Sequence, residues 1–119
     1  MGQPVAYFEI ISPDAERACA FYREMFGWTA APDPSLGGYA LVDTNAGEGA
    51  IGGGIGSPSA PGEGPSVKVY IRVDDLDTCL ERAERLGGKR LVAPMDLPAG
   101  AGRIAIFTDP DGNQVGLWA

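Results

Sequence analysis

In two stretches of the chain, a pattern of apolar and polar residues typical of a strand is followed directly by one typical of a helix. Val5–Ile11 is rich in aromatic and β-branched residues, which predicts a strand. Val67–Val73 alternates apolar and polar residues, as expected for a strand with one buried face. If Phe8 and Ile10 face the following helix, Tyr7 and Glu9 face the other side of the sheet. In the second stretch Val69 and Ile71 are expected to face the helix, and Lys68, Tyr70 and Arg72 the other side.

Both predicted strands lead into amphipathic helices with recognisable ends. Ser12 is the expected N-cap of the first helix, followed by a proline and an acid, and Gly27 ends it. Asp74 and Asp75 are expected to cap the second helix, which ends at Gly87–Gly88. The apolar stripes are Ala15, Ala18, Cys19, Tyr22, Met25 and Phe26 in the first helix, and Leu76, Cys79, Leu80, Ala83 and Leu86 in the second.

The same order of elements occurs twice. A shift of sixty-one residues superimposes the first strand and helix on the second pair. Three short strands are expected after each helix, at Trp28–Ala31, Tyr39–Asp43 and Ala50–Ile55, and at Arg90–Ala93, Arg103–Thr108 and Gln114–Trp118. This predicts a single α+β domain over residues 1–119, with two tandem βαβββ modules at 4–56 and 66–119. The linker is placed at 57–65, where glycine and proline are frequent.

Composition excludes several classes of protein. A net charge of −7 and the lack of any basic run argue against nucleic-acid binding. No apolar stretch approaches the roughly 20 residues of a membrane helix, and the start of the chain lacks signal-peptide character. We therefore expect a cytoplasmic protein with two reduced cysteines. Because the chain contains no histidine, it cannot form a Ser-His-Asp or Cys-His catalytic device.

Three motifs favour turns or loops over cofactor sites. Gly47–Gly52 matches the dinucleotide fingerprint, but further glycines follow where that motif requires a helix. Asp109–Gly112 resembles the start of a calcium loop without its later ligands, and a hairpin turn is expected instead. Metal binding by the loop acids Asp43, Glu48 or Glu63 is disfavoured because these residues have unrelated positions.

A concentration of polar and aromatic side chains is predicted on the sheet face away from the helices. An ordinary solvated face with Glu9 paired to Lys68 or Arg72 is one interpretation. The large aromatic area among the charges favours the other, a ligand-binding surface. The candidate ligand-binding residues are Tyr7, Glu9, Lys68, Tyr70, Arg72, Gln114 and Trp118.

Three segments in the right order resemble the vicinal oxygen chelate superfamily, which includes glyoxalase I, bleomycin-resistance proteins and extradiol dioxygenases. They are Asp14–Trp28, Val73–Gly88 and Asp109–Asn113 before Leu117. The resemblance implies the glyoxalase/bleomycin-resistance fold, in which a curved mixed sheet forms a cup, within a homodimer. It also implies four metal-ligand positions, and these fall on Tyr7, Lys68, Gly116 and a position near Gly54. None of these residues is a usual ligand of a divalent cation.

Together with the resemblance, these residues predict a protein without metal or cofactor that binds a small molecule. The resemblance implies that the ligand lies in the cup and that the protein sequesters, for example, an antibiotic or a metabolite. Lys68 and Arg72 suggest an anionic or oxygen-rich ligand, although Glu9 could equally hold a cation. The alternative is a metal-independent isomerase, epimerase or lyase. In that case Glu9 is the base, and Tyr7, Lys68 or Tyr70 is the acid or oxyanion support.

Overall fold

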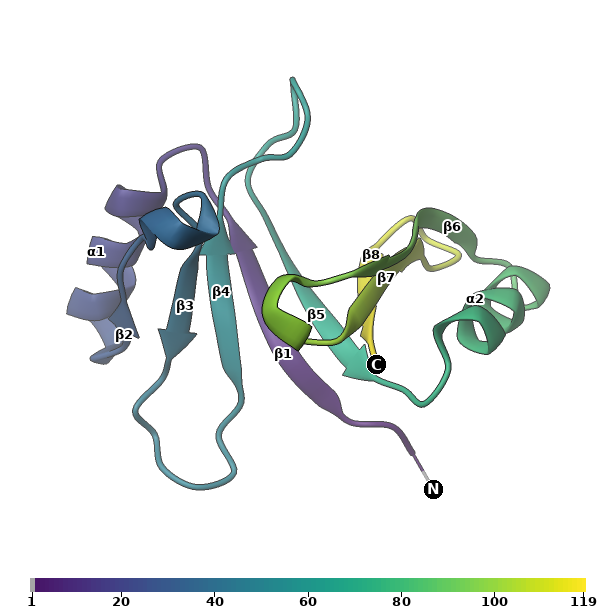
Figure 1. Ribbon diagram of the computed structural model, residues 1–119. Helices are drawn as coiled ribbons and strands as arrows, with labels where there is room; N and C mark the ends of the chain where they lie inside the picture. The colour runs from purple at the N-terminus through teal and green to yellow at the C-terminus, as the bar shows by residue number, and fades with distance from the viewer. Residues whose placement is uncertain (1) are drawn as a thin grey trace. The chain divides into compact units, whose positions relative to one another are not determined.

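The computed structural model describes residues 2–119 and contains the predicted repeat of strand, helix and three strands (Figure 1). The elements in chain order are β1 (Val5–Ile11), α1 (Ala15–Phe26), β2 (Thr29–Ala30), η1 (Pro34–Leu36), β3 (Ala40–Asp43), β4 (Gly52–Gly56), β5 (Ser66–Arg72), α2 (Leu76–Arg85), β6 (Lys89–Asp96), η2 (Pro98–Gly100), β7 (Arg103–Thr108) and β8 (Gln114–Trp118). This order confirms the α+β class and the two βαβββ modules.

The chain forms two compact units, and each contains strands of both directions. The first unit is Tyr7–Val67, in which the strand order is β2-β3-β4-β1 and β4 runs parallel to β1. The second is Lys68–Ala119 with the start of the chain up to Ala6, in which the order is β6-β7-β8-β5 and β8 runs parallel to β5. The other strand pairs within each unit are antiparallel, so the mixed sheet is confirmed.

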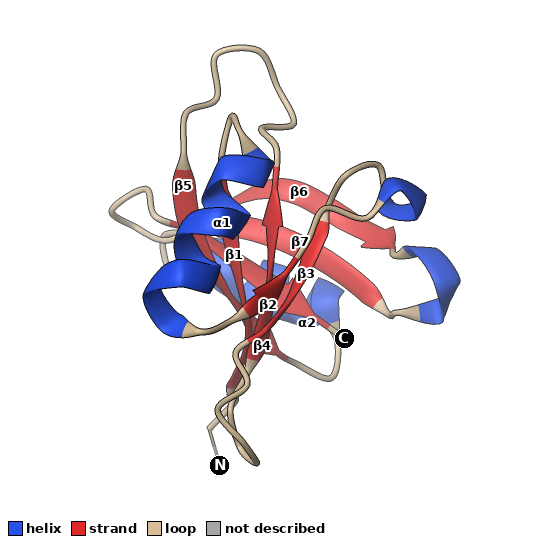
Figure 2. Cartoon of the chain, turned by 90° about the vertical axis from the view of Figure 1, so that its left-hand side faces the viewer, coloured by secondary structure: helices blue, strands red, loops and turns tan. Residues whose placement is uncertain are grey.

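The core of the first unit lies between α1 and the strands beside it (Figure 2). Ile10 and Cys19 are buried there, and Phe8 packs against the same cluster, so the predicted facing of Phe8 and Ile10 is confirmed. The apolar stripe of α1 is less buried than expected at its end. Met25 and Phe26 are 56% and 55% exposed, although the Phe26 ring lies against the rings of Tyr22 and Trp28.

The two helices begin at aspartates. Asp75 caps α2 as predicted, and its carboxylate accepts a hydrogen bond from the backbone N–H of Thr78 (3.1 Å). The predicted N-cap of α1 was wrong, because Asp14 takes this role and accepts from Arg17 N (3.1 Å). Ser12 instead accepts a hydrogen bond from the backbone of Asp14, which holds the turn that precedes the helix. Both caps satisfy backbone donors that a helix start leaves unpaired.

The core of the second unit contains Leu76 and Leu80 of α2 packed against Ala105 and Leu117. Ile71 packs against this cluster as predicted. The expected burial along the rest of β5 was wrong, because Val67 and Val69 are 69% and 38% exposed. Lys68 and Tyr70 are instead only 8% and 5% exposed. The helix covers only the last part of β5, so the two valines receive no cover from it, while Tyr70 packs over the adjacent strand.

Candidate functional site

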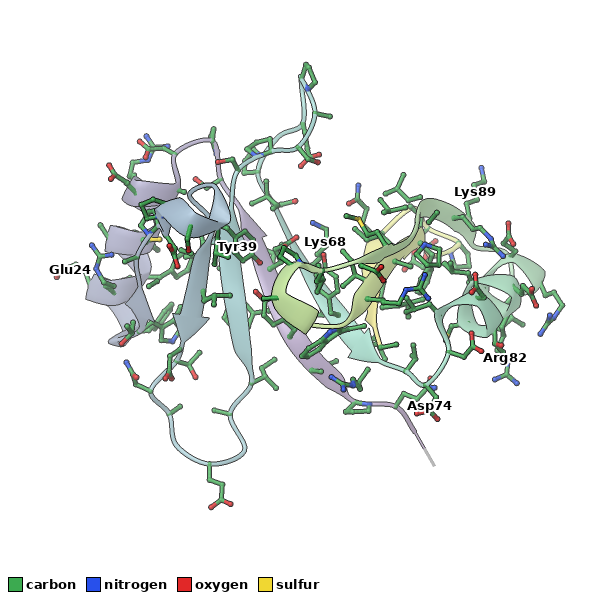
Figure 3. All side chains as sticks on the ribbon, viewed as in Figure 1. Glu24, Tyr39, Lys68, Asp74, Arg82 and Lys89 are labelled. Carbon is green, nitrogen blue, oxygen red and sulfur yellow. The ribbon has the colours of Figure 1, made fainter. Side chains whose placement is uncertain are left out.

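A hydrogen-bonded group of two tyrosines and a glutamate lies on the face of the first unit that points away from α1. The hydroxyl of Tyr39 donates to Oε2 of Glu9 (2.8 Å). The hydroxyls of Tyr7 and Tyr39 are also 2.8 Å apart. Since Tyr39 donates to Glu9, Tyr7 donates to Tyr39, and the three side chains form one hydrogen-bonded chain. All three are half-buried, and Tyr39 lies beside β4 (Figure 3).

Glycines in β4 create the space that these tyrosines occupy. Gly54 is directly opposite Glu9 in the parallel pairing of β1 and β4. A Cβ atom at Gly54 would overlap the hydroxyls of Tyr39 and Tyr7. A Cβ at Gly56 would lie 2.8 Å from Cδ1 of the Tyr39 ring. The bare backbone of β4 therefore lets two phenols approach the carboxylate closely.

Burial keeps both phenols of this group protonated. Loss of solvent is the main cause that raises the pKa of Tyr7 above its usual value, and the negative charge of Glu9 adds to it. Burial also raises the pKa of Tyr39 strongly, with further contributions from its bond to Tyr7 and from Glu9. Neutral phenols remain hydrogen-bond donors, so this group can present a carboxylate supported by phenol O–H groups to a bound molecule.

Sequence reasoning missed Tyr39, although it placed Tyr7 and Glu9 on this face. The available signal was the glycine-rich end of the predicted strand Ala50–Ile55, where Gly52, Gly54 and the following Gly56 share one face. Alternate glycines on one face of a strand leave an empty row that a large side chain from a neighbouring strand can fill. Tyr39 precedes β3, the antiparallel neighbour of β4, which gives its ring access to that row.

The equivalent face of the second unit also carries a tyrosine over a glycine. Tyr70 is opposite Gly116 in the pairing of β5 and β8, and a Cβ at Gly116 would overlap the Tyr70 ring. Two residues further along the same strands, Arg72 pairs with Trp118. The guanidinium carbon of Arg72 lies 4.4 Å from the centroid of the Trp118 ring. This cation–π contact presents a flat surface with a positive charge.

The remaining predicted site residues have different environments. Gln114 is exposed at the start of β8, opposite Thr108. Lys68 is the buried charged residue among residues 2–119. The Trp118 indole N–H donates to the carbonyl of Ala101 (2.9 Å), so it holds the loop after η2. The predicted set is thus divided between the units, and its convergence in one cup stays a prediction.

The four positions that the resemblance implies for a metal do not fit a divalent cation. Gly54 and Gly116 have no side chain, and rings of Tyr39 and Tyr70 fill the adjacent space. A phenol held protonated at Tyr7 and an ammonium at Lys68 are unsuitable for an uncompensated dication. Within residues 2–119, no group of three Cys, Asp or Glu side chains could hold a metal ion.

The other sequence motifs form local structure. The glycine-rich Gly47–Gly52 segment leads into strand β4 and not into a helix, so it lacks the helix N-terminus of a dinucleotide site. Asp109 accepts hydrogen bonds from the backbone of Asp111 and from both nitrogens of Asn113, which lower the pKa of its carboxyl. This turn joins β7 to β8 as predicted.

None of the helices within residues 2–119 has the length and apolar character needed to cross a bilayer.

Comparison with known proteins identifies the family. The model of the glyoxalase/bleomycin resistance protein/dioxygenase superfamily matches residues 5–117. The chain belongs to this superfamily. It is 34% identical to the anthracycline biosynthesis protein DnrV of Streptomyces peucetius, across 95% of the chain but only 46% of that protein. It is 33% identical to a glyoxylase-like domain-containing protein of Didymella fabae, across 92% of the chain and 88% of that protein.

Solved structures support the fold of this superfamily member. The methylmalonyl-CoA epimerase from Mycobacterium tuberculosis has a TM-score of 0.67 with 19% identity, across 98% of the chain and 86% of that protein. At this identity the likeness concerns the fold alone. The chain spans about half the length of the first curated relatives it matches, so the activity of those longer proteins does not transfer directly.

Proposed function

We propose that this protein binds a flat, oxygen-rich small molecule without using a metal ion, and that the Tyr7–Tyr39–Glu9 group contacts its polar edge. The observation that supports this most strongly is the packing of two phenols over Gly54, at the place where the resemblance implies a metal ligand. A neutral phenol pair next to a carboxylate offers both donors and acceptors to hydroxyl and carbonyl groups.

The nature of the ligand is inferred from the second unit and from one relative. The Arg72–Trp118 contact provides an aromatic and cationic surface that suits a flat ring bearing oxygen atoms. The relative DnrV is described as an anthracycline biosynthesis protein. We therefore infer a hydroxylated polycyclic quinone, sequestered or held by the protein, as the class of ligand.

Calorimetric titration with 1,4-dihydroxyanthraquinone tests this proposal. The wild-type protein is expected to bind the probe. Tyr39→Phe is expected to weaken binding about tenfold because it removes a phenol O–H, and Glu9→Gln by a similar factor because it replaces a charged acceptor with a neutral amide. Arg103→Gln is a matched control, since Arg103 only pairs with the exposed Asp96. Failure of the wild-type protein to bind, or equal binding by all variants, would contradict the proposal.

A metal-independent proton transfer is a second candidate, and the Tyr39–Glu9 hydrogen bond favours it. Glu9 would remove a proton from a carbon next to a carbonyl group, and the protonated phenols would remain the hydrogen-bond donors of the site. Exchange of that proton with deuterated solvent, followed by mass spectrometry, separates turnover from binding. Exchange that disappears in Glu9→Gln supports catalysis, and binding without exchange supports the first candidate.

The proposal also covers the oligomeric state of the protein and its cellular compartment. We infer a homodimer, because Leu91 and Met95 on the edge strand β6 are 50% and 48% exposed and would be covered by a second copy. Sedimentation velocity distinguishes a dimer from a monomer. The free thiols of Cys19 and Cys79 support a reducing, cytoplasmic location.

A further inference from the structure

An apolar groove lies on the helix side of the first unit, on the opposite sheet face from the Tyr7–Tyr39–Glu9 group. Its volume is about 450 Å³. It is formed by the end of β1, the first two turns of α1 and the start of β5, and its lining residues are Ile10, Ile11, Ser12, Arg17, Ala18, Phe21, Tyr22, Pro65, Ser66 and Val67. We refer to these ten residues as the α1 groove.

Large apolar side chains in the α1 groove are open to solvent. Phe21 is 56% exposed and Val67 is 69% exposed. A ligand in the groove would cover both, and covering apolar area is the main source of affinity in such sites. The volume falls within the roughly 300–1,000 Å³ typical of small-molecule pockets, which combine apolar walls with few polar groups.

The α1 groove contains one charged group, the Arg17 guanidinium. The Arg17 side chain is exposed and forms no ion pair or hydrogen bond among residues 2–119, although the chain has 16 acidic residues. The other polar groups of the lining are the hydroxyls of Ser12, Tyr22 and Ser66, and Ser12 already donates to and accepts from the backbone of Asp14. Arg17 is therefore the one cationic group that the groove offers to a ligand, and a planar guanidinium pairs well with a carboxylate.

The charges next to Arg17 limit the charge of the ligand. Asp14 and Glu16 precede it at the start of α1, and the whole protein carries a net charge of −7. A monoanion can pair with one guanidinium, but a phosphate dianion would also meet repulsion from these carboxylates. We propose that the α1 groove binds a carboxylic acid with an unbranched apolar tail, with its carboxylate on Arg17 and its tail on Phe21 and Val67.

The repeat supplies an internal control for this site. The second unit has a smaller groove of about 310 Å³ at equivalent positions, where Ile71, Cys79 and Ala83 replace Ile10, Ala18 and Tyr22. Its arginine, Arg82 on α2 (Figure 3), lies in the next helical turn, and Gln3 and Pro110 also line this groove. The repeat places Arg82 at the position equivalent to Phe21, so the smaller groove lacks an aromatic ring there, and we expect the acid to prefer the α1 groove.

Two-dimensional ¹H–¹⁵N NMR titration with decanoate tests the proposal, with decanol as the neutral probe. Decanoate is expected to shift the amide signals of residues 10–12, 14–22, 66 and 67; residues 13 and 65 are prolines without an amide proton. In Arg17→Gln the affinity for decanoate should fall about tenfold while decanol binding is unchanged, as expected for loss of a charge-assisted hydrogen bond. Arg17→Lys should restore part of the lost affinity for decanoate, and Arg82→Gln should leave the affinity for both probes unchanged. Phe21→Ser should weaken the binding of both probes.

The proposal is overturned if decanoate causes no shifts, if the shifts lie in other parts of the chain, or if Arg17→Gln leaves its affinity unchanged. It is also overturned if a second copy of the chain covers the groove. In that case sedimentation velocity would show a dimer that Phe21→Ser dissociates, and decanoate would bind only to the dissociated form.

Discussion

Gly54 is the residue whose lack of a side chain most directly shapes the candidate site. It lies opposite Glu9, and the hydroxyls of Tyr7 and Tyr39 occupy the volume where its Cβ would be. Gly54→Ala is expected to displace these side chains and to lower the free energy of unfolding by about 1–3 kcal/mol, as overpacking does in other interiors. Chemical denaturation measures this change.

Gly64→Ala is the matched control for that substitution. A Cβ at Gly64 meets no atom within 4 Å, and its backbone does not require the left-handed conformation. Its free energy of unfolding should stay within about 0.5 kcal/mol of the wild-type value or rise slightly. An equal loss of stability in both variants would contradict the close packing over Gly54.

The two buried phenols predict a dependence of stability on pH. Burial raises the pKa of Tyr7 and of Tyr39 above the usual value of 10.0. Both phenols are protonated in the folded and unfolded states below that value, so their contribution is constant there. Above it the unfolded state loses protons first, and stability falls by at most about 1.4 kcal/mol per pH unit for each phenol.

Tyr39→Phe should therefore reduce the loss of stability above pH 10.0, because this variant lacks one of the two phenols whose pKa the fold raises. Denaturation measured at several pH values in wild-type and Tyr39→Phe protein gives this difference, and effects of other groups cancel between the two. The same pH dependence in both proteins would show that Tyr39 is not held protonated by the fold.

At the scale of the elements, the helix starts give a clear stability prediction. Asp75→Ala removes the hydrogen bond to Thr78 N and should lower the free energy of unfolding by about 1 kcal/mol. Asp74→Ala is the neighbouring control, because Asp74 is exposed and does not cap α2. Thermal denaturation of both variants tests this prediction. An equal loss of stability in both variants would contradict the assignment of Asp75 as the N-cap.

Helices and strands were largely predictable from local pattern, because caps and apolar periodicity act within a few residues. The error at Ser12 shows the limit of this reasoning. Ser12 and Asp14 are both good N-cap residues, and the choice depends on which backbone N–H each side chain can reach. The strand bounds also differ by a few residues, as in β6, which begins at Lys89 and continues to Asp96.

Burial along β5 could not be read from its alternation. The pattern correctly separated Ile71 from Lys68 and Tyr70, but it assumed that the apolar face would be the buried one. The actual burial depends on where α2 lies and on the space above Gly116, and both are tertiary facts. Tyr39 was missed for the same reason, since its partners lie thirty or more residues away in the chain.

At the scale of the whole molecule, the sequence repeat correctly predicted two modules, and the resemblance of three segments correctly predicted the superfamily. Both units have a tyrosine over a glycine of a strand that runs parallel to the first strand of the unit. In both units a tyrosine side chain therefore fills the space over a glycine at or near an implied metal-ligand position. A protein built in this way is expected to bind its ligand with or without divalent cations.

Calorimetric titration of 1,4-dihydroxyanthraquinone, repeated with excess chelator and with added Zn²⁺, tests this expectation most directly. We expect the same affinity under all three conditions, and a loss of affinity in Glu9→Gln and Tyr39→Phe. Binding that appears only with an added cation, or that the chelator abolishes, would contradict it.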